Sequence, residues 1–281
     1  MSSLTVAKKE FQDAIRSRWL IGLTVVFVVF AGGFTLALPS LLGLLLGPTV
    51  DTATTGVLLT AMGGSTTLLI PLIGLVVGYK SIVGERDSGS LKLLLGLPHT
   101  RRDVVIGKLV GRSAVVAVST LIGFVVAAVV GVAVYSSFEV GTFLTYTVLA
   151  MVLGVVFIAI ATGFSAGVRS TTWALLGAGG LYLLFQFVWG LIPTVVRYVI
   201  NGFSLPSLAQ PPNWQLFFSL LNPQTAFTSA AAAVIPSISG IATALDSPPI
   251  YLQNWFGFVV LAAWIVVPIA LGYLRFNGTD L

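Results

Sequence analysis

Six long stretches of the chain are apolar and free of charged residues, and this pattern determines the predicted fold. A helix needs roughly 20 apolar residues to cross a bilayer. Each stretch is long enough, so we predict an all-α integral membrane protein with six transmembrane helices. The predicted spans are residues 19–42, 57–79, 113–134, 143–168, 173–192 and 251–274.

The composition agrees with this pattern. Of the 281 residues, 57% are hydrophobic and only 8% are charged, whereas a soluble domain carries about 25% charged residues. Soluble enzymes and nucleic-acid-binding proteins are therefore excluded, although the net charge is +5. We expect one transmembrane domain over residues 1–281, surrounded by lipid and without a nucleic-acid partner.

The basic residues predict the orientation. Of the 14 Lys and Arg residues, four lie in 8–18 and seven in 80–112, and Arg169 and Arg275 fall on the same side of the six-span pattern. Only Arg197 falls on the other side. The positive-inside rule then makes both termini and the 80–112 loop cytoplasmic in a multi-pass protein of the plasma membrane.

Residues 1–18 combine an apolar stripe with a charged face. The apolar positions at helical spacing are Leu4, Ala7, Phe11, Ala14 and Ile15. The charged positions opposite them are Lys8, Lys9, Glu10, Asp13 and Arg16. This pattern favours an amphipathic helix that lies in the headgroup plane, and a frayed basic tail is the alternative.

Residues 193–250 form the largest segment predicted to lie outside the cytoplasm. Within it, 214–235 is apolar enough to raise the alternative of a seventh span. Asn222 followed by Pro223 predicts a helix cap and a first helical residue in the middle of that stretch. We therefore expect two short helices that rest on, or dip into, the outer leaflet.

The 80–112 loop contains residues that are typical of helix ends and helix starts. Gly89 is suited to end the helix that descends from the second span, and Gly96 and Pro98 stop a short leucine-rich helix that follows it. Thr100 and Asp103 have the spacing of a capping box, which opens a new helix that continues into the third span. The leucines of the short helix need burial against a partner protein or the headgroup region, and the pattern leaves both open.

Groups with catalytic or cofactor chemistry are scarce. The chain has no Cys and a single His, His99, and no ionisable residue lies near the centre of a predicted span. This disfavours metal sites, intramembrane catalysis and ion-coupled pumping. Gly107-Lys108 lacks the rest of a phosphate-binding loop, so we expect no catalytic, cofactor-binding or metal-binding residue here, and an energy source in another subunit.

The loop pattern resembles the permeases of type-2, exporter-like ABC transporters. The shared features are an acidic-basic pair, a glycine, a leucine run ending in proline, an arginine, and Gly-Lys before the next span. Lys9 to Phe11 and the LNPQTAF run at 221–227 also look like that family. The residues that the resemblance assigns to ATPase coupling are Glu85, Arg86, Gly89, Leu91, Leu94, Leu95, Pro98, Arg101 and Lys108.

The resemblance implies a non-catalytic permease whose coupling helix, with Leu91, Leu94 and Leu95 as its seated face, docks on a separate ABC ATPase that binds Mg-ATP. Six spans are few to enclose a pathway, so we expect a second permease copy, identical or related. The apolar walls, with Thr162, Ser165 and Gln186 as candidate lining residues, favour an amphipathic or hydrophobic substrate. An ATP-independent carrier or channel and a non-transporting scaffold are the alternatives.

Overall fold

The computed structural model describes residues 3–46, 54–90, 100–204 and 211–278. Over these ranges the chain is helical, and the only β-type pairing is an isolated bridge between Thr54 and Ser137. The long helices are α2 (Arg18–Leu46), α3 (Thr55–Gly78), α6 (Arg101–Val134), α7 (Val140–Gly167), α8 (Thr171–Leu183) and α12 (Phe256–Asn277). The shorter ones are α1 (Ser3–Ile15), α4 (Val83–Asp87), the π-helix η1 (Leu184–Val188), α9 (Leu191–Ile200), α10 (Asn213–Leu220), α11 (Pro223–Val234) and the 3₁₀ turns η2 (Ile241–Ala244) and η3 (Ile250–Leu252).

Six helices of the described residues are long and apolar enough to cross a membrane, which confirms the predicted all-α fold. The third is longer than the predicted span, because α6 starts at Arg101 and runs without a break to Val134. The capping box explains this start: Asp103 N donates to Thr100 Oγ1 at 3.1 Å, and Thr100 N donates to Asp103 Oδ2 at 3.2 Å. The helix opened in the loop therefore becomes the transmembrane helix.

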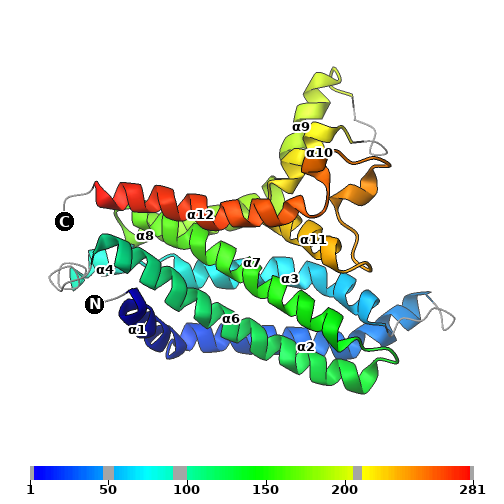
Figure 1. The fold of residues 1–281 in the computed structure, drawn as a ribbon, viewed down its shortest axis with the longest axis horizontal. Helices are drawn as coiled ribbons and strands as arrows, with labels where there is room; N and C mark the ends of the chain where they lie inside the picture. Colours follow the sequence, from blue (N-terminus) through cyan, green and yellow to red (C-terminus); the bar gives the residue numbers. More distant parts are fainter. Residues whose placement is uncertain (1–2, 47–53, 91–99, 205–210, 279–281) are drawn as a thin grey trace.

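Helix α7 forms the centre of the bundle (Figure 1). It packs against α3, α6, α11 and α12, and 67% of its apolar window is buried, compared with 17% for α8. Glycines allow the closest of these contacts. A Cβ on Gly74 would lie 2.8 Å from Phe157 Cβ, and a Cβ on Gly163 would overlap the Pro268 carbonyl. These small residues serve helix packing in the protomer, as their spacing suggests.

The 214–235 region folds as two short helices, α10 and α11, rather than as one long helix. Asn222 caps α11 by accepting a hydrogen bond from Gln224 N at 2.9 Å, and Pro223 is the first residue of the helix. The tip of this hairpin lies deep, because Trp264, the ninth residue of α12, donates to Leu221 O at 2.8 Å. The hairpin therefore inserts among the long helices.

Helices α1 and α4, the start of α8 and the last turn of α12 lie at one end of the bundle (Figure 1). We call this the charged end, because the sequence pattern assigns 13 of the 14 basic residues to this side of the spans. At the opposite end, α9 and α10 project away from the long helices (Figure 1). The arrangement agrees with an even number of spans.

Candidate coupling site at the charged end

Helix α1 packs directly on the first turns of α6. A Cβ on Gly107 would lie 2.6 Å from Val6 Cβ, and a Cβ on Gly111 would lie 2.5 Å from Ala7 O. Real Cβ atoms do not approach so closely, so only glycine at these two positions permits the contact. The buried residues of α1 are Val6, Ala7 and Glu10. Glu10 thus differs from its sequence assignment to the polar face, because that part of the helix turns toward α6.

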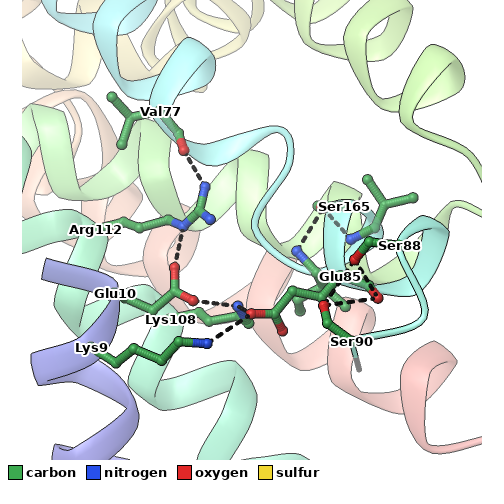
Figure 2. Close-up of polar contacts among 11 residues, drawn as sticks. Lys9, Glu10, Val77, Glu85, Ser88, Ser90, Lys108, Arg112 and Ser165 are labelled. Atoms are coloured by element: carbon green, nitrogen blue, oxygen red, sulfur yellow. Dashed lines mark hydrogen bonds and ion pairs between the residues drawn. The ribbon is translucent and has the colours of Figure 1, made fainter. Parts of the chain in front are cut away.

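The contact between α1 and α6 carries a buried ion-pair network (Figure 2). Lys108 Nζ of α6 lies 2.9 Å from Glu85 Oε1 of α4 and also binds Glu10 Oε1 of α1. Arg112 Nε donates to Glu10 Oε2 at 2.8 Å, and its Nη1 donates to the Val77 carbonyl of α3. One lysine and one arginine therefore join four helices, α1, α3, α4 and α6.

The burial of these charges makes the network sensitive to its geometry. The Lys108 side chain is completely buried and the Glu10 side chain is 7% exposed. A buried charge is tolerated only when it is paired and hydrogen-bonded. Burial alone would raise the pKa of Glu10, but Arg112 and Lys108 outweigh it and hold the pKa of this carboxyl below its ordinary value. Glu10 is thus a carboxylate at neutral pH.

The short helix α4, which directly precedes the leucine-rich segment, is fixed to the turn between α7 and α8. Ser165 Oγ accepts the backbone N–H groups of Ile82 and Val83, both at 3.1 Å. Arg86 Nη1 donates to Val168 O at 2.8 Å, and Asp87 Oδ2 accepts from Thr171 N at 2.8 Å. A displacement of α4 must therefore strain the contacts with α7 and α8.

The other flank of the segment is fixed to the end of α12. Arg101 donates to the backbone carbonyls of Phe276 and Asn277, the second at 2.9 Å. The Phe276 ring lies below two guanidinium groups, 5.3 Å from that of Arg101 and 5.7 Å from that of Arg86. Residues on both sides of the leucine-rich segment thus meet at the last turn of α12.

Five of the residues that the family resemblance assigns to coupling are described, and they gather here: Glu85, Arg86, Gly89, Arg101 and Lys108. Gly89 follows the end of α4 with a φ of +74°, as expected for a glycine that ends a helix. The other four, Leu91, Leu94, Leu95 and Pro98, lie outside the described residues. Coupling itself stays a prediction for all nine.

The three candidate pathway residues lie on two different elements, Thr162 and Ser165 on α7 and Gln186 on η1. Thr162 and Ser165 are completely buried, and the Ser165 hydroxyl accepts from the backbone of Ile82 and Val83. Gln186 lies in the π-helix η1, and its Oε1 accepts from Gln224 Nε2 of α11 at 2.8 Å. Asn222 Nδ2 donates to Phe185 O at 2.8 Å beside it. Gln186 therefore makes an interhelical hydrogen bond, and its role as a lining residue stays a prediction.

Sequence reasoning missed three members of the charged end, Glu10, Asp87 and Arg112. A usable signal was present in GKLVGR, residues 107–112, where a glycine followed by a cation occurs twice at a four-residue spacing. That spacing puts both glycines on one face of a helix and both cations on an adjacent one. Within the described residues, no three Asp, Glu or His side chains lie together as a metal site.

Comparison with known proteins places this chain in a family. The family described as ABC-2 family transporter protein matches residues 4–281. The chain is 31% identical over 280 residues to a probable ABC transporter permease protein NosY of Stutzerimonas stutzeri, with 97% of this chain and 96% of the relative covered. It is 29% identical over 275 residues to a probable ABC transporter permease protein NosY of Pseudomonas aeruginosa, with 92% and 95% covered. The chain belongs to the ABC-2 family of transporter membrane proteins.

Proposed function

We propose that this chain is the membrane-spanning subunit of an ATP-driven exporter, and that a separate ABC ATPase acts on the segment between α4 and α6. The observation that carries the proposal is the burial of Lys108 between Glu10 and Glu85. This lysine links the two flanks of the segment to α1. A displacement of the segment would change the spacing of the buried charges. It would also be transmitted to α7, α8 and α12 through the contacts of Ser165, Arg86 and Arg101.

The proposed partner carries the nucleotide chemistry. The chain has no phosphate-binding loop, so Mg-ATP would be bound and hydrolysed in the ATPase subunit. Leu91, Leu94 and Leu95 would be the seated face of the coupling helix, as the family resemblance implies. In this scheme the permease itself catalyses no reaction.

A substitution at Leu94 tests the docking. Leu94→Asp would lose an apolar contact and bury an unpaired carboxylate, which together cost several kcal/mol. We expect the variant to insert in the membrane but to lose co-purification of the ATPase and substrate-stimulated ATP hydrolysis. Leu94→Met, which keeps the apolar character, is the matched control and should retain both. Normal recruitment by Leu94→Asp would show that the leucines contact only lipid.

The orientation has its own test, which the absence of native cysteine makes direct. Ser88 follows α4 at the charged end, and Asn213 begins α10 at the other end. Single cysteines at these positions should react with a membrane-impermeant maleimide from opposite sides, with Ser88→Cys reacting only after the plasma membrane is permeabilised. Labelling of Ser88→Cys in intact cells would reverse the proposed orientation with cytoplasmic termini.

The proposed substrate is amphipathic or hydrophobic, and the proposed route runs between two permease copies. The polar groups that the deep part of the bundle offers to a route are amides and hydroxyls, such as Gln186 and Gln224, rather than charges. Such walls offer no fixed charge to a small ion, and mostly apolar walls with a few polar groups are typical of sites for small organic ligands. Reconstituted with its ATPase, the permease should therefore respond to amphipathic compounds. Transport by the permease alone in liposomes would instead favour an ATP-independent carrier or channel.

A further inference from the structure

A cavity of about 690 Å³ opens beside the ion-pair network, between α1, the start of α2 and the end of α3. Its volume is in the range of ligand pockets in proteins. Glu10 and Arg112 form part of its wall, so the cavity adjoins the buried network directly. None of the coupling contacts described above requires a space here.

The lining of the cavity is divided into an apolar and a charged part. Leu20, Leu23 and Val76 are apolar residues near the start of α2 and the end of α3. Asp13 of α1 and Lys80, just beyond α3, supply the charged part. Because Leu20 and Val76 belong to the spans and Asp13 does not, the cavity lies across the boundary between hydrocarbon and headgroups. A ligand that fills it must be amphipathic and must reach it from the leaflet at the charged end.

The charges at the rim specify the headgroup. Glu10 is already neutralised by Lys108 and Arg112. Asp13 and Lys80 form no ion pair with each other or with another described residue, and Lys80 Nζ lies 5.4 Å from the centre of the Tyr79 ring. Arg112 donates two of its N–H groups to Glu10 and to the Val77 carbonyl, and its other N–H groups are available to a ligand. The rim thus offers cationic donors and one carboxylate.

We infer that this cavity binds a zwitterionic phospholipid of the adjoining leaflet. The phosphate would face Lys80 and Arg112, the ammonium would face Asp13, and an acyl chain would lie along Leu20, Leu23 and Val76. A planar guanidinium and a nearby ammonium suit a phosphate group. The inference deepens the proposed function, on which it rests for the class of amphipathic substrate, and it puts the ligand against the residue, Glu10, that contacts Lys108.

Lipid binding to the purified permease, without any ATPase, tests the inference. The probes are dilauroyl phosphatidylethanolamine and dilauroyl phosphatidylglycerol, added to the protein in detergent and counted by native mass spectrometry. We expect one phosphatidylethanolamine per protomer to bind in preference to phosphatidylglycerol, which has no ammonium group. Equal binding of the two lipids, or no retained lipid, would overturn the assignment.

Two variants locate the lipid. Leu23→Trp fills the apolar part of the cavity and should weaken phosphatidylethanolamine binding about tenfold. Leu36→Trp on the same helix is the control, because Leu36 is exposed, lies outside the cavity and should leave binding unchanged. Equal effects of the two would show general lipid contact instead of this site.

Asp13→Asn tests the headgroup and is safe for folding, because Asp13 is exposed. It should lower phosphatidylethanolamine binding about threefold and leave phosphatidylglycerol binding unchanged, as expected for one exposed ion pair. This variant decides the matter if Leu23→Trp does not fold, and an unchanged lipid preference would contradict the inference. Lipid binding without ATPase recruitment would contradict the proposed function alone.

Discussion

The charged end of the bundle and its deep interior solve the same problem, the burial of polar groups, in different ways. At the charged end, the completely buried ammonium group of Lys108 is paired with the carboxylates of Glu10 and Glu85. In the interior, the joint between η1 and α11 uses only neutral groups: the Gln186–Gln224 pair and Asn222 bound to a backbone carbonyl. Aromatic rings cover this joint, with Phe185 and Trp264 in edge-to-face contact at 5.2 Å.

The difference follows from the surroundings. A charge at the centre of a membrane helix costs about 2.5 to 3.5 kcal/mol, so amides are the polar groups that the interior can hold cheaply. At the boundary with water, the cost is lower and strong pairs can form. Moving one partner of a buried ion pair away leaves the other charge buried and unpaired, which would suit the proposed transmission of movement from an ATPase. Hydrogen-bonded amides suit a fixed polar surface.

The largest expected effect comes from removing the central charge. Lys108→Met keeps the length of the side chain but leaves Glu85 without its buried partner and Glu10 with Arg112 alone. Removing one partner of a buried pair costs about 3 to 5 kcal/mol. We expect a loss of this size in the free energy of unfolding, measured by chemical denaturation in mixed micelles, together with uncoupled ATP hydrolysis in the reconstituted complex.

Lys9→Met is the matched control for this variant. Lys9 Nζ also approaches Glu85, at 3.8 Å, but its side chain is 56% exposed. Exposed ion pairs contribute about 0 to 1 kcal/mol, so the control should change neither stability nor coupling appreciably. Equal effects of the two substitutions would remove the proposed distinction between the buried network and ordinary surface charge.

The neutral joint should respond more weakly. Gln186→Leu and Gln224→Leu, alone and together, form a double-mutant cycle across the hydrogen bond between η1 and α11. Interhelical hydrogen bonds in membranes contribute about 0.6 kcal/mol on average, and we expect a coupling energy of that size. The single variants should also shift the concentration of amphipathic compound that stimulates ATP hydrolysis. A coupling energy of about 3 kcal/mol or more, which is the loss expected for Lys108→Met, would refute the contrast between the two regions.

Local signals in the sequence predicted the parts of the fold that depend on neighbouring residues. The six spans follow from apolar length, the start of α6 from Thr100 and Asp103, and the break before α11 from Asn222 and Pro223. The helix caps depend on residues a few positions apart, so the start of each helix can be predicted from the sequence alone. The family resemblance added Glu85, Arg86 and Lys108, which the structure brings to one end.

Long-range pairing was beyond these signals. Glu10 and Lys108 are 98 residues apart, and nothing in the α1 pattern distinguished Glu10 from the solvated charges beside it. The same applies to Ser165, whose hydroxyl accepts the backbone N–H groups of Ile82 and Val83, more than 80 residues earlier in the chain. The π-helix around Gln186 was not predicted either, because π-helices are rare and occur mostly as single turns within α-helices. For Glu10 and Ser165, tertiary contacts decided the outcome.

The smallest effect should appear on acidification. The pKa of Glu10 is lowered in the folded protein, so its carboxylate stabilises the fold fully above the ordinary pKa of about 4.3. That contribution is lost as the pH falls below this value and through the lowered pKa. Between pH 7 and pH 5 the thermal midpoints of the native protein and of Glu10→Gln should therefore keep a constant difference. Below pH 4.5 the difference should shrink, because protonation makes the native side chain as neutral as the amide. A difference that stays constant to pH 3 would mean that Glu10 acts through packing and not through its charge, and the contrast between the charged end and the neutral interior would then rest on Lys108 and Glu85 alone.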